Sequence, residues 1–249
     1  MPSYAVVGGS RGIGLEFVRQ LSANPDNTVF VLVRDKARSS HLASVVAAAG
    51  NNIHVFQADV AAAAEIAQLT GGGLDVLIHN AARLEGPHLY RNLTNYESEE
   101  QLDEDFLQFF KVNVLGVVHT VNAFLPLLRK GTAKKIIILA YGTTKAGTHM
   151  VVTKYAALLE NEGFTVVALS PGLVDTSATA VVDESDRTPA QTRAGTLADV
   201  DTDKTDYNRR LQDITAITPE ESVKGMLKVI QTVGPADTGA FLWTGNLSV

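Results

Sequence analysis

The feature that most constrains the fold of this chain is a regular alternation of short apolar runs with segments of helical periodicity. The runs are rich in β-branched side chains and resemble strands buried on both faces, which occur in parallel sheets. They are Tyr4–Gly8, Thr28–Val33, Ile53–Gln57, Leu74–His79, Lys135–Leu139 and Phe164–Leu169, with a short last strand at Ala240–Thr244. The alternation predicts an α/β fold: one domain with a doubly wound parallel sheet of the Rossmann type.

The segments between these strands have the periodicity of helices. They are Gly14–Ala23, Leu42–Ala49, Glu65–Leu69, Glu99–Leu128 and Thr144–Glu162. The fourth is long enough to be broken into two helices. Ser98 with Gln101, and Thr218 with Glu221, have the spacing of capping boxes. No repeat or linker interrupts the pattern, so residues 1–249 are expected to form a single domain.

Composition excludes several classes of function. The net charge of −6 and the pI of about 5.5 argue against nucleic-acid binding. The chain has no cysteine, so disulfides and thiolate zinc sites are excluded, and its six histidines lack metal-ligand spacing. No apolar run approaches the roughly 20 residues of a membrane span, and no signal peptide is recognised. We expect a cytoplasmic protein without a metal site, a membrane or a nucleic-acid partner.

A glycine-rich turn, Gly8-Gly9-Ser10-Arg11-Gly12-Ile13-Gly14, joins the first strand to the first helix. Glycines at such a junction let the backbone approach a pyrophosphate, which the N-terminus of the helix then attracts. The turn predicts a dinucleotide-binding site that involves Gly8, Ser10, Arg11, Gly12, Ile13 and Gly14. The alternative interpretation of these glycines is an ordinary strand-to-helix turn without a ligand.

The same turn also matches the Gly-x-Ser-x-Gly elbow of α/β-hydrolases, with Ser10 as the nucleophile. That enzyme class needs an acid and then a histidine later in the chain. The last histidine is His149, and the elbow would have to follow the first strand. A hydrolase is therefore disfavoured.

The end of the second strand bears on cofactor choice. Sites selective for NAD place a carboxylate there, whereas NADP sites place cations for the 2′-phosphate. This strand ends in Arg34, the first carboxylate is Asp35, and Arg11 can approach from the glycine turn. Two guanidinium groups favour NADP(H), although both arginines could simply lie at the surface.

Tyr141 and Lys145 directly follow the fifth strand and lie one helical turn apart. Ligands of open α/β sheets bind at the carboxyl ends of the strands, where this pair is expected. Free tyrosine has a pKa near 10, and a neighbouring ammonium lowers that pKa. The pair therefore suits proton transfer to a bound substrate.

Taken together, these motifs resemble the short-chain dehydrogenase/reductase family, and the similarity runs from the first strand to the last. Beside the glycine turn, the matching segments are Asp59-Val60, His79-Asn80-Ala81-Ala82, Asn113, the Tyr141/Lys145 pair and Pro171-Gly172-Leu173-Val174-Asp175-Thr176. The glycine turn is most similar to that of the carbonyl-reductase-like branch. The resemblance implies a Rossmann fold and a reaction that reduces a carbonyl, or oxidises an alcohol, of a small molecule with NADP(H).

The resemblance also assigns residue roles. It implies that Asn113, Tyr141 and Lys145 are catalytic. It adds as cofactor contacts Asp59, Val60, Asn80, Ala81, Ala82, Tyr141, Lys145, Pro171, Gly172, Val174 and Thr176. It further implies a homodimer or homotetramer formed through the helices that carry Asn113 and Tyr141.

One departure from the family pattern concerns the catalytic serine, which normally precedes the tyrosine by about a dozen residues. Here Leu139-Ala140 runs straight into Tyr141, and the stretch after Val60 is also short. Either the protein lacks these residues, or the sequence as printed omits loops at both places. A true loss favours the alternative function of a catalytically impaired NADP(H)-binding sensor or subunit.

A long polar segment at about 175–217 is weakly periodic and rich in carboxylates. Loops of this length are either functional lids or disordered segments. We expect a mobile substrate lid here.

Overall fold

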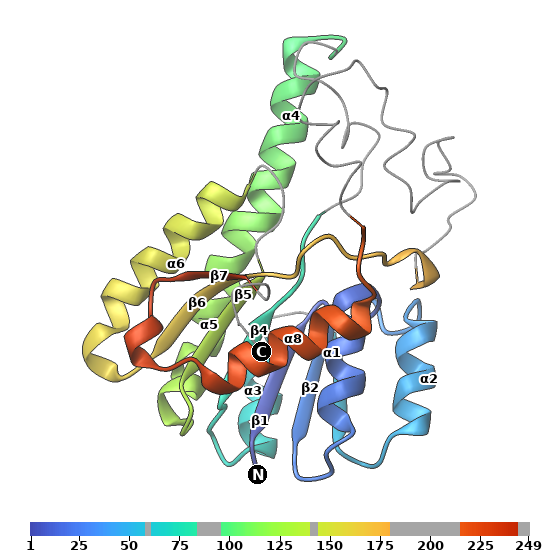
Figure 1. The fold of residues 1–249 in the computed structure, drawn as a ribbon, viewed down its shortest axis with the longest axis vertical. Helices are drawn as coiled ribbons and strands as arrows, with labels where there is room; N and C mark the ends of the chain where they lie inside the picture. Colours follow the sequence, from blue (N-terminus) through green and yellow to red (C-terminus); the bar gives the residue numbers. More distant parts are fainter. Residues whose placement is uncertain (58–60, 84–95, 140–143, 180–214, 244–249) are drawn as a thin grey trace.

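The computed structural model describes residues 1–57, 61–83, 96–139, 144–179 and 215–243, with only the backbone of Ala61 and Lys145. Seven parallel strands form one sheet in the order β3-β2-β1-β4-β5-β6-β7, and helices cover both faces (Figure 1). This is the predicted doubly wound fold. The strand order reverses between β1 and β4, where such sheets bind their ligands.

The strands lie close to their predicted positions. They are β1 (Ser3–Val7), β2 (Thr28–Val33), β3 (Ile53–Gln57), β4 (Val76–His79), β5 (Lys135–Leu139), β6 (Thr165–Ser170) and β7 (Phe241–Trp243). Strand β4 begins two residues later than predicted. Leu74 donates its backbone N–H to Leu127, and the Asp75 side chain binds Ser3, so both residues bond outside the ladder.

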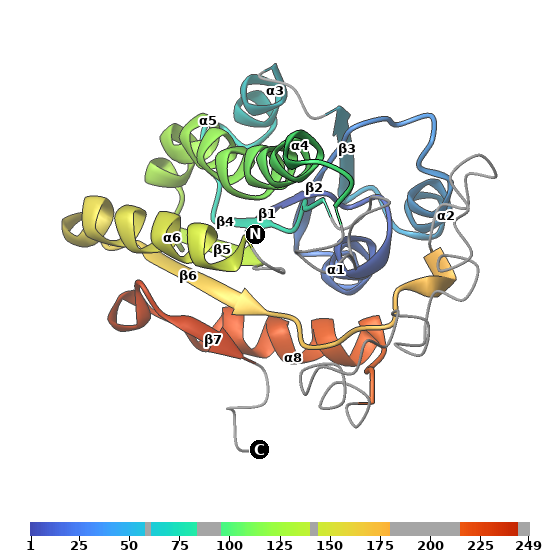
Figure 2. The same cartoon turned by 90° about the horizontal axis from the view of Figure 1, so that it is seen from above.

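One face of the sheet is covered by α1 (Gly12–Ser22), α2 (Ser40–Ala48) and α8 (Pro219–Thr232). Figure 2 shows this layer opposite the layer that contains α3 and α5. Helix α8 begins at the predicted capping box, where the Thr218 hydroxyl accepts the Glu221 N–H and the Glu221 carboxylate accepts the Thr218 N–H. Pro219 stands at the first helical position, where a missing N–H costs nothing.

The other face is covered by α3 (Ala61–Leu69), α5 (Gly116–Lys130) and α6 (Lys145–Leu159). Helix α3 has nine residues, so the short crossover after Val60 still accommodates a helix between β3 and β4. Helix α6 continues into a 3₁₀ turn, η2 (Glu160–Glu162), that ends at Gly163 in the left-handed conformation (φ 72°).

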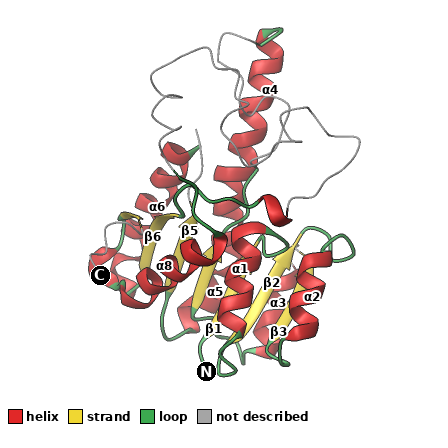
Figure 3. Cartoon of the chain, turned by 45° about the vertical axis from the view of Figure 1, so that its right-hand side comes forward, coloured by secondary structure: helices red, strands yellow, loops and turns green. Residues whose placement is uncertain are grey.

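The helix predicted at Glu99–Leu128 is one continuous helical unit with a π-helical segment in its middle, rather than two separate helices. It comprises α4 (Glu99–Phe110), a π-helical segment η1 (Lys111–Leu115) and α5. Helix α4 projects beyond the carboxyl ends of the strands (Figures 1 and 3). Its predicted capping box is only half formed, because the Ser98 hydroxyl accepts the Gln101 N–H but the Gln101 side chain accepts from Glu97.

The whole unit Glu99–Lys130 is the one helix among the described residues that could cross a membrane by length and composition. Its most apolar window has a mean hydropathy of 1.3, and 44% of that window is buried in the domain. Core helices of globular domains have the same composition, because one stripe of such a helix packs against a sheet.

Candidate active site

The predicted glycine turn lies at the carboxyl end of β1, where its backbone is closely packed. Gly8 adopts φ 85°, and a Cβ atom there would lie 2.8 Å from the Cα of Ala81. A Cβ on Gly14 would lie 2.0 Å from the Gly8 carbonyl oxygen. Neither position accepts a side chain, so the turn after β1, the start of α1 and the segment after β4 pack closely against one another, as the glycines of a dinucleotide-binding turn allow.

The segment after β4 braces this turn. The Asn80 side-chain amide donates to the Gly8 carbonyl oxygen over 2.9 Å, and the Asn80 backbone N–H donates to Val7 over 3.1 Å. The structure therefore brings together Gly8, Gly14, Asn80 and Ala81, as the sequence predicted. Ser10 and Ala82 lie half-buried beside them, and the Ile13 side chain is buried in the core.

Two arginines lie near the turn. Arg11 is half-buried directly before α1, and Arg34 is exposed directly after β2. Burial lowers the pKa of Arg11, and repulsion by Arg34 lowers it further. The two guanidinium groups are thus close enough to repel each other, an arrangement that a bound anion relieves.

Asn113 lies in η1, buried with 7% of its surface exposed. Its side-chain oxygen accepts the Arg83 N–H over 2.7 Å, and its amide donates to the Arg83 carbonyl and the Thr144 hydroxyl, both over 3.1 Å. The Thr148 hydroxyl lies 3.2 Å from the Asn113 carbonyl oxygen, to which it donates. Asn113 therefore joins the loop after β4 to the first turn of α6.

Four predicted site residues cannot be placed in full. Asp59, Val60 and Tyr141 lie outside the described residues, and Lys145 is described only as the first residue of α6. Thr144, whose hydroxyl binds Asn113, directly precedes Lys145. The structure thus places Asn113 beside the segment that carries the predicted pair, and the roles of Tyr141 and Lys145 stay predictions.

The predicted segment after β6 leads from the sheet toward the glycine turn. Pro171 is buried, and its carbonyl oxygen accepts a hydrogen bond from the Ser222 hydroxyl. Gly172 adopts φ 80°. Val174 then forms an isolated parallel bridge with Ile217. Thr176 reaches the turn, since a Cβ on Gly12 would lie 3.3 Å from its methyl group.

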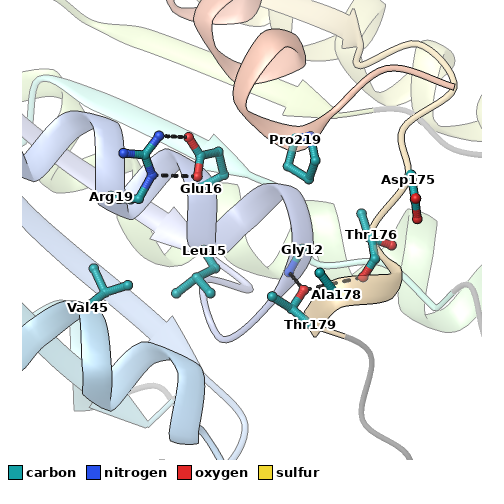
Figure 4. Close-up of a pocket in the computed structure, with 10 residues that line it drawn as sticks. All are labelled: Gly12, Leu15, Glu16, Arg19, Val45, Asp175, Thr176, Ala178, Thr179 and Pro219. Carbon is teal, nitrogen blue, oxygen red and sulfur yellow. Dashed lines mark hydrogen bonds and ion pairs between the residues drawn. The ribbon is translucent and has the colours of Figure 1, made fainter.

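One contact at this site had no signal in the sequence. The Thr179 hydroxyl, in the 3₁₀ turn η3 (Ser177–Thr179), accepts the Gly12 N–H over 2.8 Å (Figure 4). This N–H lies at the start of α1, among the backbone donors that the sequence assigns to a pyrophosphate. A pocket of about 120 Å³ adjoins the contact, between α1, α2 and α8. It is far smaller than the several hundred Å³ of a typical ligand site.

Comparison with known proteins agrees with this geometry. A sequence model described as short chain dehydrogenase matches residues 3–187 of the chain. The chain belongs to the short-chain dehydrogenase family. The sequence-based expectation of family and fold is therefore confirmed.

Two similar curated proteins come from fungi. The short-chain dehydrogenase/reductase AacuF of Aspergillus aculeatus is 38% identical, with 93% of this chain and 92% of the relative covered. The short-chain dehydrogenase/reductase atnB of an Arthrinium species is 40% identical, with 72% of this chain and 77% of the relative covered.

Solved structures share the fold. An NADPH-bound carbonyl reductase from chicken fatty liver has a TM-score of 0.71 and 25% identity, with 100% of this chain and 98% of that one covered. An actinorhodin polyketide ketoreductase with NADPH has the same TM-score of 0.71 and 23% identity, with 99% and 98% covered.

The dehydrogenase is shorter than AacuF within the matched region. The alignment spans 258 positions, whereas 93% of this 249-residue chain supplies about 232, so about 26 positions have no residue here. Compared with AacuF, this chain therefore lacks residues within the aligned region. The two places where the sequence indicated a loss, after Val60 and before Tyr141, lie outside the described residues, and the choice between the two explanations stays open.

A buried histidine lies at the edge of the site. His79 ends β4, is 3% exposed, and neither ring nitrogen has a hydrogen-bond partner among the described residues. Burial lowers the pKa of His79 to about 4, and the nearby Ala81 carbonyl offsets only part of this effect. The imidazole is therefore neutral at pH 7.

Proposed function

We propose that this protein is an NADP(H)-dependent reductase that reduces the carbonyl of a small organic substrate, or oxidises the corresponding alcohol. The observation that carries the proposal is the convergence of three elements at one edge of the sheet. The glycine turn after β1, the loop after β4 and the start of α6 are joined through Asn80 and Asn113. Membership of the family supports the same reaction class.

The glycine turn fits a dinucleotide. Gly8 and Gly14 hold the turn close against the sheet, and Gly12, with φ 54°, starts α1 without a side chain, so that a pyrophosphate would meet backbone N–H groups there. The surrounding contacts proposed from the sequence are Ser10, Arg11, Gly12, Ile13, Arg34, Asp59, Val60, Asn80, Ala81, Ala82, Pro171, Gly172, Val174 and Thr176. A bound nicotinamide dinucleotide would supply the hydride.

The surroundings of Arg34 favour NADP(H) over NAD(H). Arg11 and Arg34 present two cations at the end of β2. The carboxylate of Asp35 accepts the N–H groups of Ala37 and Arg38, so it is engaged in its own turn. A 2′-phosphate would find two guanidinium partners here. The NADPH-bound structural relatives are consistent with this preference.

In the proposed mechanism Tyr141 donates a proton to the substrate oxygen, and the Lys145 ammonium favours the phenolate that results. Asn113 positions this region. Its side chain holds the backbone of Arg83 and the Thr144 hydroxyl, and thereby fixes the loop after β4 against α6. The η1 segment that carries Asn113 and helix α6 both have side chains buried in the core, so the site is built on rigid elements.

The proton donor is tested by Tyr141→Phe, which removes one oxygen. We expect kcat for carbonyl reduction to fall at least about 100-fold, as for other general acids. The dissociation constant of NADPH, measured by fluorescence titration, should change little. Undiminished reduction by this variant would refute the role of Tyr141.

Cofactor choice is tested by Arg34→Ala. Loss of a charge-assisted hydrogen bond should raise the dissociation constant of NADPH about 10- to 100-fold and leave that of NADH within about 2-fold. The exposed Arg38, four residues on, serves as the matched control. Equal losses for both cofactors would contradict an NADP(H) preference.

A second candidate function is a catalytically impaired NADP(H)-binding protein with a sensor or subunit role. It is motivated by the direct junction of Leu139-Ala140 with Tyr141, which leaves no place for the family's serine. Losing one donor to the substrate oxygen can cost about 10²–10³ in rate. Tight NADPH binding without turnover of any aldehyde or ketone in a broad panel would favour this candidate, and ready turnover would exclude it.

A further inference from the structure

Arg83 stands out among the groups that the proposed mechanism does not use. It follows Asn80-Ala81-Ala82 directly, and its backbone N–H and carbonyl are both bound by the Asn113 side chain. Its position is therefore fixed within one hydrogen bond of a proposed catalytic residue. A residue at this place is well situated to contact the substrate.

The side chain of Arg83 is turned toward α4. Its guanidinium carbon lies 5.5 Å from the centre of the Phe109 ring. Phe109 precedes Asn113 by four residues, which is about 6 Å along a helix. Helix α4 begins at Glu99 and extends past the carboxyl ends of the strands (Figure 1), so Phe109 precedes Asn113 toward the projecting end of the helix, and ligands of such sheets bind beyond the carboxyl ends of the strands.

Apart from the Phe109 ring, the charge of Arg83 has no partner in the described part of the chain. Its Nε is buried without a hydrogen bond, and no salt bridge joins it to a described carboxylate. Asp105, one turn before Phe109 on α4, is instead bonded to the Tyr96 hydroxyl. Keeping an unpaired cation partly buried is costly. In a chain with a net charge of −6, such a cation is best explained by an external anion.

We propose that Arg83 binds a carboxylate of the substrate, so that the natural substrates are carbonyl compounds bearing a carboxylate. The planar guanidinium matches the two oxygens of a carboxylate, and stacking on Phe109 restricts its orientation. This assignment rests on the proposed reductase function and adds the substrate class to it. Arg83 is a specificity-determining residue, separate from the groups that transfer the proton.

The test uses two aldehydes that differ in charge and by one methyl group: 4-carboxybenzaldehyde and its methyl ester, methyl 4-formylbenzoate. The variant is Arg83→Met, which keeps an unbranched apolar side chain next to Phe109. Asn113 holds Arg83 through its backbone, so the substitution leaves that contact in place. Arg83→Lys, which keeps the charge but not the planar fork, is the matched control.

We expect kcat/KM for the carboxylate to fall about 10- to 100-fold in Arg83→Met, mainly through KM, because a hydrogen bond to a charged group is lost. The value for the ester should change less than about 3-fold, and Arg83→Lys should retain part of the preference. An equal loss for both aldehydes, or a wild-type protein that does not favour the carboxylate, would overturn the assignment.

A binding measurement separates this inference from the proposed function. The ligand is 4-methylbenzoate, which has no reducible carbonyl, titrated calorimetrically into the protein with saturating NADP⁺. Binding that Arg83→Met weakens supports the assignment even if neither aldehyde is reduced, a result that would refute only the reductase. Turnover of both aldehydes without any charge preference would retain the reductase and refute the role of Arg83.

Discussion

At the scale of single residues, His79 links the site to acid stability. Its pKa of about 4 lies below the ordinary value of 6.5, so between these pH values the unfolded chain binds a proton that the folded chain does not. Stability is therefore complete above pH 6.5 and is lost as the pH falls through 4. The difference between these two pKa values corresponds to a loss of about 3 kcal/mol.

The expected result is that urea unfolding of the wild type loses stability between pH 7 and pH 4 faster than that of His79→Leu. The variant has no imidazole to protonate, so the difference between the two profiles isolates this residue from other titrating groups. Parallel profiles would show that the buried ring does not control acid stability.

Single residues also show where sequence reasoning stops. The glycine turn and Asn80 were predicted because short motifs impose their own backbone geometry. Arg83 was missed, although it adjoins a recognised motif. Its place in the site depends on a hydrogen bond with Asn113, which is 30 residues away in the sequence. Thr179 was missed for the same reason, since its partner Gly12 lies 167 residues away. Pairings of this kind are set by tertiary structure and leave no local pattern.

At the scale of elements, Asp75 ties the amino ends of β1, β4 and β5 together. Its carboxylate accepts the N–H and hydroxyl groups of Ser3 and Thr132 over 2.7–2.9 Å. Burial acts to raise the pKa of Asp75, but these hydrogen bonds outweigh it and lower the pKa to about 2. The carboxylate is thus ionised in the folded protein at any pH above about 2.

We expect Asp75→Ala to lower the free energy of unfolding at pH 7 by about 2–3 kcal/mol, because several donors lose a charged acceptor. Chemical denaturation measures this change. The exposed Asp26 also lies on the amino side of the sheet, and Asp26→Ala is the matched control. This substitution should lower the free energy of unfolding by less than about 0.5 kcal/mol. Similar losses for both variants would argue against a joining role for Asp75.

The contact between η3 and α1 leads to a prediction about cofactor affinity. The Gly12 N–H is bonded to Thr179, so a pyrophosphate that uses this donor must first displace the hydroxyl. Thr179→Val removes the competitor, and the net value of one hydrogen bond predicts NADPH binding about 2- to 10-fold tighter. Fluorescence titration measures the affinity, with Thr179→Ser as control. Weaker binding in the valine variant would show that the hydroxyl assists the cofactor.

The positions of strands and helices were predicted better than the geometry within them. The strands were found because buried parallel strands are continuous apolar runs, whatever they pack against. The long helix was foreseen, but the π-helical segment at Lys111–Leu115 was not, because it contains neither proline nor glycine. Packing of η1 against α6, through residues such as Thr148, accompanies this geometry and is not encoded locally.

At the scale of the whole molecule, the outer surfaces of α4 and α6 carry large exposed apolar side chains. They include Phe106, Leu107, Phe110, Met150 and Leu158, of which Leu107 and Leu158 are 67% and 64% exposed. Apolar patches of this kind mark association surfaces. We propose that they form the interface of a homodimer, the smaller of the two assemblies that the sequence suggested.

Leu107→Glu should convert such a dimer to a monomer, because a buried carboxylate at an interface is strongly unfavourable. Light scattering coupled to size-exclusion chromatography measures the mass. Leu69→Glu is the matched control, since Leu69 on α3 is 56% exposed and lies outside this surface. A wild-type monomer would contradict the proposal.

The bridge between Val174 and Ile217 has a consequence for how such a protein can change over time. The Asp175 N–H donates to the Ile217 carbonyl oxygen, and the Ile217 N–H donates to the Leu173 carbonyl oxygen. The two ends of the intervening stretch are therefore hydrogen-bonded side by side. Doubling the length of a closed loop costs only about 0.6 kcal/mol. Material can therefore be added, removed or exchanged between these ends without altering the register of the sheet. The sequence predicts a substrate lid in this stretch, most of which lies outside the described residues, so exchanging it could give one scaffold new substrates while its cofactor site stays the same.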